Sequence, residues 1–202
     1  MKIEGHNVKC FCPNCINYFE DEEIVKYNGT DDVEEDSFYC PECYGEIVFI
    51  DEGITEIIKL LNESGLVKTV FCCEGHFDIT EDGNDYYESL PYVSMALTEY
   101  GSFDDIFSNA YLPTDDIVTK NVRKSPFYVI NKKTGETIGS PVSIEFMMAY
   151  PDYFDDEDLE TEKMYFEKAK QEYLKAMTKF AIFMKMKGSS VVSKKKYDDE
   201  KE

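Results

Sequence analysis

Two cysteine pairs of identical spacing near the start of the chain constrain its fold more than any other feature. Segments 12–15 and 40–43 both have the sequence CPxC, and 24 residues separate them. Two tight turns of this kind present four thiolates that can close a tetrahedral site around one metal ion. The spacing therefore predicts a Zn²⁺ site with the ligands Cys12, Cys15, Cys40 and Cys43.

A fifth thiol, Cys10, leaves one choice of ligand open. In a β-strand residues 10 and 12 lie on the same face, so Cys10 either replaces Cys12 at the metal or packs as a spare thiol. The four cysteines could also stay unbound, or hold iron in a rubredoxin-like site. The chain has seven cysteines, and an odd number cannot be used up in disulfides within one chain. In a reducing cytosol, cysteines favour metal binding or free thiols.

Short apolar segments flank both cysteine pairs. Residues 7–11 and 16–19 surround the first pair, and residues 37–39 and 47–50 surround the second. Each CPxC turn, called a knuckle below, thus lies between two expected strands. This order of strand, knuckle and strand occurs twice over about 40 residues and resembles a zinc ribbon or a rubredoxin-like knuckle pair. The resemblance implies a zinc-ribbon module over residues 1–52. A module this small has little core, so its metal would supply much of the folding free energy.

The charge of the chain is negative and unevenly distributed. The net charge is −21; residues 1–162 hold 10 basic and 36 acidic side chains, whereas residues 163–202 hold 11 basic and 6 acidic ones. Such an acidic body repels phosphates, so we expect it not to bind nucleic acid non-specifically. The charge predicts either a solvated surface or attraction to a basic protein surface, including mimicry of nucleic acid.

Nothing in the sequence indicates a membrane span or a secretory signal. No run of about 18 apolar residues occurs, and the N-terminal residues lack an apolar signal-peptide core. We therefore expect a cytoplasmic protein, in the host cytoplasm if a phage encodes it.

The middle of the chain alternates between patterns typical of helices and of strands. Residues 54–66 have helical spacing of isoleucine and leucine. Residues 78–88 are acidic and rich in turn formers, which predicts a mobile loop, and residues 142–149 either form a strand or begin a helix. The strands, short helix and hairpin turn expected elsewhere cover residues 67–73, 91–98, 103–110, 121–131 and 133–136.

One long helix is expected near the C-terminus, over residues 156–187. Its apolar residues recur every three or four positions, and a helix of this length exceeds a small domain. Its distal end is therefore expected to dock on a partner or on a second copy. We expect an α+β fold in which residues 53–187 form a small domain closed by this helix, followed by a disordered tail over residues 188–202. The predicted stripe consists of Leu159, Phe166, Ala169, Tyr173, Met177, Phe180 and Met184.

A second group of chemically active residues follows the strand expected at 67–73. Cys73, Glu74, Gly75 and His76 lie at a strand end, where binding sites are common. Three roles are open besides a plain structural turn. Cys73 can act as a nucleophile with His76 as its base, the turn amides can bind an anion, or cysteine and histidine can ligate a metal.

A resemblance to known protein families rests on three neighbouring features. They are a helix with Leu60-Leu61-Asn62, a following glycine, and a strand that ends in Cys-x-Gly-His. Over residues 54–76 they resemble the small SCxGH-type domains of uncharacterised phage and bacterial proteins. They are also distantly similar to the wybutosine-synthesis methyltransferase family, in which a Ser-Ser-Cys-Ser-Gly-Arg step belongs to a site for S-adenosylmethionine and a tRNA base. This chain has Phe71-Cys72 in place of the first serines and His76 in place of arginine. The resemblance therefore implies a ligand loop at Cys73, Gly75 and His76.

These observations favour a protein that works by binding over an enzyme. Phosphate-loop, dinucleotide and nucleophile-elbow motifs are absent. We expect a zinc-binding, acidic adaptor or regulatory protein whose partner is a basic protein surface. The alternatives are a ligand-binding protein or enzyme with its site at the turn 73–76, and a nucleic-acid-binding accessory protein of transcription or replication.

Overall fold

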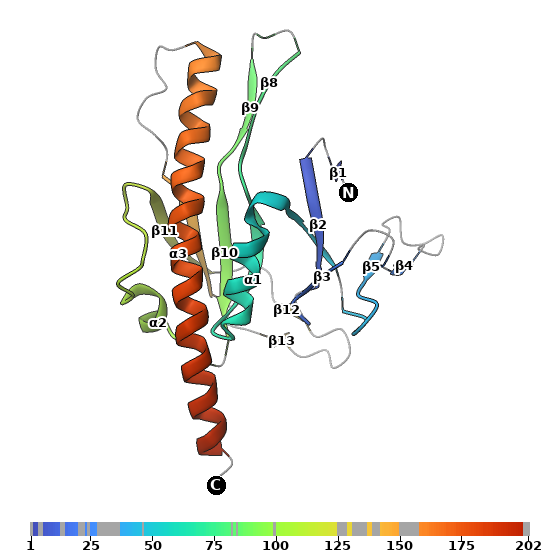
Figure 1. The fold of residues 1–202 in the computed structure, drawn as a ribbon, viewed down its shortest axis with the longest axis vertical. Helices are drawn as coiled ribbons and strands as arrows, with labels where there is room; N and C mark the ends of the chain where they lie inside the picture. The colour runs from blue at the N-terminus through green and yellow to red at the C-terminus, as the bar shows by residue number, and fades with distance from the viewer. Residues whose placement is uncertain are drawn as a thin grey trace.

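A four-stranded antiparallel sheet covered by two helices forms the centre of the protein (Figure 1). In this computed structural model the strand order is β11-β14-β10-β7. The helices α1 and α3 pack on each other, and both contribute to the core that the sheet lines. The elements of this central unit are α1 (Thr55–Glu63), β7 (Val67–Cys73), β10 (Tyr92–Leu97), β11 (Val118–Lys124), β14 (Val142–Met148) and α3 (Leu159–Asp199).

The structure describes most of the chain, with gaps. The described residues are 2–3, 6–12, 15–19, 23, 25–27, 37–45, 47–81, 83, 85–98, 100–124, 129–130, 137–138, 142–149 and 158–199.

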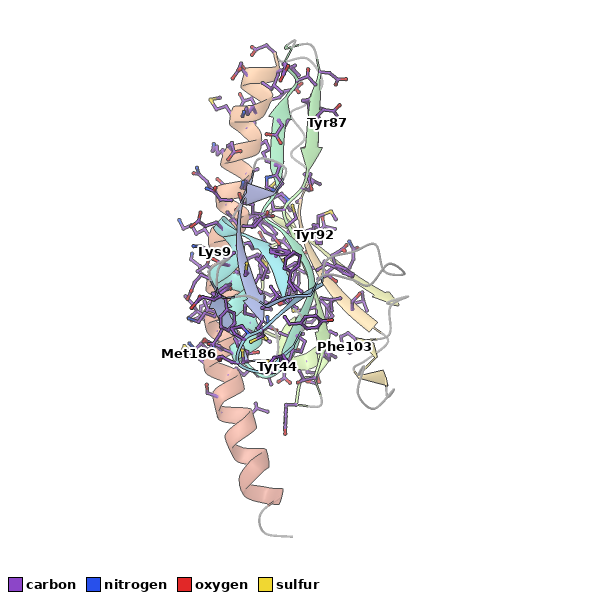
Figure 2. All side chains as sticks on the ribbon, turned by 90° about the vertical axis from the view of Figure 1, so that its right-hand side faces the viewer. Lys9, Tyr44, Tyr87, Tyr92, Phe103 and Met186 are labelled. Atoms are coloured by element: carbon purple, nitrogen blue, oxygen red, sulfur yellow. The ribbon has the colours of Figure 1, made fainter. Side chains whose placement is uncertain are left out.

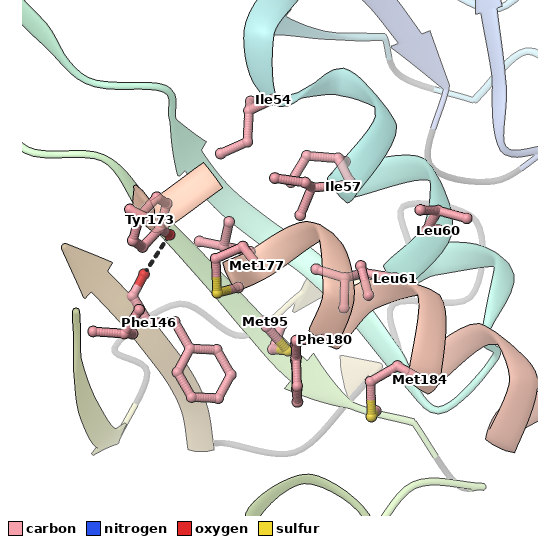
Figure 3. Packing of buried hydrophobic residues seen from close by; sticks show 14 of the residues in the cluster. Ile54, Ile57, Leu60, Leu61, Met95, Phe146, Tyr173, Met177, Phe180 and Met184 are labelled. Atoms are coloured by element: carbon pink, nitrogen blue, oxygen red, sulfur yellow. Dashed lines mark hydrogen bonds between the residues drawn. The ribbon is translucent and has the colours of Figure 1, made fainter. Parts of the chain in front are cut away.

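The core lies between the sheet and the two helices (Figure 3). The apolar core residues of the sheet stand at alternate positions, such as Val93 and Met95 in β10 and Ile144, Phe146 and Met148 in β14. The positions between them include the buried polar residues Ser94, Ser143 and Glu145. Helix α1 contributes the isoleucine and leucine residues that its spacing predicted, and a short 3-10 turn, η1 (Glu52–Ile54), leads into it. Buried Asn62 at the end of α1 fixes the helix to the edge strand β7, because its side chain bonds both the backbone N–H and the hydroxyl of Thr69.

The apolar stripe of α3 faces this core as predicted. Phe166, Tyr173, Met177, Phe180 and Met184 are fully buried, whereas Leu159 and Ala169 are half-buried. The buried hydroxyl of Tyr173 donates to the backbone oxygen of Phe146 in β14, at 2.9 Å. At the start of the helix the Asp158 carboxylate accepts from the backbone N–H of Thr161 at 3.1 Å, which satisfies one of the free helix N–H groups.

Helix α3 does not end at Lys187, so the prediction of a disordered tail over residues 188–202 is wrong for residues 188–199 and lies outside the described residues beyond them. The helix continues to Asp199, and Figure 1 shows its C-terminal end extending past the other labelled helices. Gly188 is the reason that the chain can pass α1 at this point, because a Cβ there would lie 1.9 Å from the backbone oxygen of Ser64. Ion pairs of Lys185 with Glu63 and of Lys187 with Asp105 hold the same turn of the helix in place.

The N-terminal module is a set of short strands beside the central unit (Figure 1). Strand β2 pairs with β1, β3 and β6, and β4 pairs with β5. Its core extends into the central one, since Phe11 and Ile50 belong to the main cluster of buried residues. The strands are β1 (Lys2–Ile3), β2 (His6–Cys12), β3 (Asn17–Phe19), β4 (Val25–Tyr27), β5 (Ser37–Tyr39) and β6 (Val48–Asp51).

The prediction of a mobile loop over residues 78–88 is wrong, because a β-hairpin occupies this region. Strands β8 (His76–Ile79) and β9 (Tyr86–Ser89) are antiparallel. Phe77 stacks on Tyr86 with ring centroids 4.5 Å apart and also contacts Phe166 of α3 at 5.5 Å. Phe77, Ile79 and Tyr86 lie on the less exposed face of the hairpin together with Glu88, whereas Asp78 and Tyr87 are exposed on the other face.

The remaining elements are short. Helix α2 (Phe103–Phe107) begins with a capping box formed by Ser102 and Asp105, and β12 (Val129–Ile130) pairs with β13 (Thr137–Ile138). The turn predicted at 133–136 lies outside the described residues. Strand β14 occupies residues 142–148, where the sequence allowed either a strand or the start of a helix.

The fold is α+β with a long C-terminal helix. No helix in the described ranges is long and apolar enough to cross a membrane.

Candidate metal centres

The sulfur atoms of Cys12, Cys15, Cys40 and Cys43 lie in one cluster, all within 4.8 Å of one another. The Cys12 and Cys43 sulfurs are 3.5 Å apart, and those of Cys15 and Cys40 are 3.6 Å apart. A disulfide bond needs about 2.05 Å, whereas a tetrahedron with Zn–S bonds of about 2.3 Å has S···S edges of about 3.8 Å. The four thiols therefore suit a shared metal ion.

The two knuckles share one backbone hydrogen bond and one residue of positive φ. In the first, the N–H of Ile16 donates to the oxygen of Cys12 at 2.8 Å; in the second, the N–H of Tyr44 donates to the oxygen of Cys40 at 3.0 Å. Ile16 and Tyr44 both have positive φ, 61° and 56°. This conformation is unfavourable for residues other than glycine and costs on the order of 1–2 kcal/mol each. Both turns thus keep a strained residue directly after the second cysteine.

The environment of the sulfurs differs between the inner and outer members of the cluster. Cys12 and Cys40 are fully buried, Cys15 is half-buried and Cys43 is exposed. Burial opposes ionisation of Cys40, but hydrogen bonds from the backbone N–H groups of Cys43 and Glu42 lower the pKa of its thiol. Burial, together with hydrogen bonds to Cys12 and Cys40, raises the pKa of Cys15. The backbone N–H groups of the second knuckle therefore favour a thiolate at Cys40.

Cys10 is not a member of the four-sulfur cluster. It is buried in the small core of the N-terminal module, with Cys12, Phe19, Cys40 and Ile47. Of the two roles open to Cys10, the geometry favours the packed thiol.

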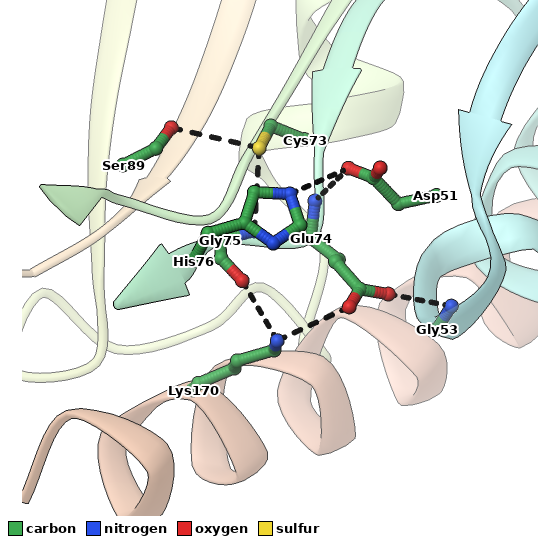
Figure 4. Close-up of polar contacts among 8 residues, drawn as sticks. All are labelled: Asp51, Gly53, Cys73, Glu74, Gly75, His76, Ser89 and Lys170. Atoms are coloured by element: carbon green, nitrogen blue, oxygen red, sulfur yellow. Dashed lines mark hydrogen bonds and ion pairs between the residues drawn. The ribbon is translucent and has the colours of Figure 1, made fainter. Parts of the chain in front are cut away.

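A second cluster brings together three different donors. Oxygen, sulfur and nitrogen atoms of Asp51, Cys73 and His76 all lie within 4.8 Å of one another. His76 Nε2 is 3.4 Å from Asp51 Oδ2. Figure 4 shows the three side chains converging where β6 and β7 end and β8 begins.

An interruption in a long β-hairpin explains why Cys73 and His76 point to one place. Cys73 pairs with Tyr92, and His76 pairs with Ser89, so the same register continues from β7–β10 into β8–β9. Residues three apart in a regular strand point to opposite faces. Gly75 interrupts the strand with φ of +86°, a conformation that glycine adopts without strain.

The other two residues expected at this turn hold its backbone in place. Glu74 points away from the cluster: its carboxylate accepts from the N–H of Gly53 at 2.6 Å and from Lys170 of α3 at 3.2 Å. Lys170 also donates to the backbone oxygen of Gly75 at 2.7 Å. The turn is therefore fixed from two sides, by the start of η1 and by α3 (Figure 4).

The pKa of Cys73 argues against its use as a nucleophile. Burial raises the pKa of this thiol and the Asp51 carboxylate raises it further, although hydrogen bonds with Ser89 and Gly75 oppose the shift. Burial also raises the pKa of neighbouring Cys72 to about 12. Nucleophilic cysteines have lowered pKa values, because the thiolate is the reactive form.

Sequence reasoning missed three contributors to these sites. Asp51 reaches the turn from a strand of the N-terminal module, and no local motif marks it. Ile16 and Tyr44 occupy positions where a glycine would have indicated positive φ, but their own residue types give no such signal.

Comparisons with known proteins add no relative from which a role could be transferred. Protein-family models, curated proteins and solved structures were each compared with the chain, and none matches it.

Proposed function

We propose that the protein is a zinc-binding adaptor in which the N-terminal ribbon is a structural element and the acidic body binds a basic protein surface. The single observation that carries the zinc proposal is the four-sulfur cluster with its two matched knuckles. Four protein ligands fill a tetrahedral zinc ion and leave no position for substrate, which is typical of structural sites. We expect about one zinc ion per ribbon.

The composition of the ribbon's own core supports a structural role. Three of its buried members are cysteines, and Phe19 and Ile47 are the only other buried residues of that cluster in the described part of the chain. So little apolar surface gives weak stabilisation by itself. A structural zinc ion contributes on the order of 10 kcal/mol or more to such modules.

Two features of the surface support docking by charge. Four lysines form ion pairs with Glu63, Glu74, Asp105 and Asp115. These pairs carry no net charge, so the net charge of −21 belongs to the other acids. The exposed aromatic and apolar side chains are spread along the molecule: Figure 2 shows Tyr87 toward one end of the long axis, far from Tyr44 and Met186. A surface of this kind recognises a partner mainly through electrostatic complementarity.

The zinc proposal is tested by metal analysis of matched cysteine variants. Cys12→Ser should lose the bound zinc, whereas Cys10→Ala should retain it, because both thiols are buried in the same core but only Cys12 belongs to the four-sulfur cluster. Zinc content by elemental analysis, before and after dialysis against a strong chelator, is the measurement. Equal zinc contents in the two variants would contradict the assignment.

The docking proposal is tested with two charge variants of equal size. Replacing the exposed acids Glu42, Glu81 and Asp116 by their amides should weaken capture of a basic partner, and replacing the exposed lysines of α3 by glutamine should not. Those lysines are Lys168, Lys175 and Lys179. Capture should also fall with added salt, because surface charges are screened within about 10 Å at 0.1 M. Binding that is insensitive to salt and to both variants would rule out docking by charge.

A further inference from the structure

We propose that Asp51, Cys73 and His76 form a second metal site, for a divalent ion of the zinc class, with three protein ligands and a fourth position for water. This site lies outside the four-sulfur ribbon site and has a different donor set. It also differs in what it joins, because its ligands come from the N-terminal module and from the central hairpin.

The mixture of donors determines the class of ion. One carboxylate oxygen, one thiol sulfur and one imidazole nitrogen lie within 4.8 Å of one another. Calcium and magnesium select oxygen ligands, whereas zinc binds oxygen, nitrogen and sulfur together at about 2.0–2.3 Å. Ligand atoms around a tetrahedral zinc ion lie about 3.3–3.8 Å apart, so a small inward movement of these side chains is enough to bind the ion.

Backbone amides already orient two of the three ligands. The N–H of Glu74 donates to Asp51 Oδ2 at 3.0 Å, and the N–H of Gly75 donates to the Cys73 sulfur at 3.3 Å. Hydrogen bonds of this kind fix metal ligands in position and are a regular part of metal sites. The hydroxyl of Ser89 lies 3.6 Å from the same sulfur, on the strand opposite His76.

The separation of His76 and Asp51 also fits two ligands better than a dedicated ion pair. Their facing atoms are 3.4 Å apart, whereas a charge-assisted N–H···O bond is about 2.7–2.9 Å long. Only 17% and 16% of the two side chains is exposed. The cluster is therefore largely shielded from water and still reachable by an ion.

An ion at this position would join two parts of the protein. Asp51 is the last residue of β6, which is paired with β2 in the ribbon, whereas Cys73 and His76 flank the interruption of the central hairpin. The ribbon metal cross-links the N-terminal module internally. The second metal would cross-link that module to the body.

The test counts zinc sites in the full-length protein. Zinc retained after desalting is measured by elemental analysis, and further sites are then titrated with Zn²⁺ by calorimetry up to roughly 100 µM. We expect a total of about two ions for the wild type and for the control Cys72→Ala, and about one for Cys73→Ala and His76→Ala. Cys72 is the matched control because it neighbours Cys73 but packs against the core.

The two proposals fail in distinguishable ways. A wild-type total of about one ion that Cys43→Ser abolishes would overturn the second site and leave the ribbon site intact. An unchanged total in His76→Ala would equally overturn it. Loss of the ribbon ion with retention of an ion that depends on His76 would instead overturn the ribbon proposal.

A measurement on the wild type avoids dependence on the folding of variants. The chain has two histidines, so NMR of ¹⁵N-labelled histidine gives few signals to follow. Adding Zn²⁺ should shift the ring nitrogen signals of His76, because a metal-bound nitrogen differs from a free one. Histidine ring signals that are unchanged by Zn²⁺ would overturn the proposal.

Discussion

The N-terminal ribbon and the central unit are stabilised in different ways. The ribbon has short strands, a core composed mainly of cysteines and two strained knuckle residues. The central unit has a sheet whose inner face is covered by α1 and α3 and a large cluster of fully buried aliphatic and aromatic side chains. We therefore expect removal of metal and removal of core volume to affect different parts of one chain.

Metal removal is expected to give the largest effect, and to give it locally. Stripping the ribbon removes a contribution on the order of 10 kcal/mol, so backbone amides of β2, β3 and β6 should lose protection from hydrogen exchange. Amides of β10 and β14 should stay protected, because their core needs no metal. Protected ribbon amides in protein shown to be metal-free would mean that the ribbon does not depend on its metal for stability.

Truncation of a core side chain should give the opposite pattern. Phe180→Ala removes a fully buried ring that packs edge-on against Phe146, and we expect it to lower the global free energy of unfolding by about 3–5 kcal/mol. The zinc content should not change. Ile182→Ala, two residues along the same helix but exposed, is the control, and denaturant melts give the measurement; equal losses for both variants would show that the inner face of α3 is not the critical one.

Gly188→Ala tests the crossing of α3 and α1. Alanine is favoured over glycine in a helix by about 1 kcal/mol, but here the added methyl group would overlap the backbone of Ser64. We expect a net loss of about 1–3 kcal/mol, measured by denaturant melts. Ser189→Ala, at an exposed position of the same turn, should be close to neutral, and a stabilised Gly188→Ala protein would mean that the two helices do not approach this closely.

The smallest expected effect concerns the strained knuckle residue Tyr44. Tyr44→Gly should stabilise the metal-loaded ribbon by up to about 1 kcal/mol, because glycine adopts positive φ without strain and Tyr44 is 72% exposed. Tyr87→Gly is the matched control, since Tyr87 is as exposed but lies in β9, where glycine destabilises a strand. Hydrogen exchange of ribbon amides measures the effect of Tyr44→Gly, and thermal melts measure the effect of Tyr87→Gly. Destabilisation by Tyr44→Gly would show that the turn is not strained.

The sequence was informative wherever a local pattern determined the structure. The spacing of the buried residues in α1 and α3 and the apolar strands around the cysteines predicted these elements, because burial of one face follows directly from periodicity. The hairpin β8–β9 was missed because Asp78 and Glu88 obscured the alternation of Phe77, Ile79 and Tyr86. Where α3 extends beyond Lys187, Gly188 lies close to the backbone of Ser64, and composition does not reveal such a contact with a distant segment.

The two candidate sites also differ in how far local sequence patterns mark them. The four sulfurs of the ribbon are marked by two local motifs, so their proximity was predictable. Asp51 joins Cys73 and His76 only through the packing of β6 beside the hairpin, 22 residues from the nearer of them in the chain. Tertiary contacts of this kind cannot be inferred from spacing, so the local sequence of the turn at 73–76 does not reveal its full set of donors.

The interrupted hairpin has a consequence for how the chain can change in length. Because the register is the same on both sides of Gly75 and Pro91, the outer ladder of β8 and β9 is an extension of the inner one. Deleting one facing pair, one residue from each outer strand, would keep the cross-strand register but turn every pair nearer the tip to the other face. Deleting two successive facing pairs would shorten the hairpin and leave every remaining side chain on its present face. Length variation in the outer ladder is therefore expected in steps of two facing pairs, and the cluster at its base would be unaffected by it.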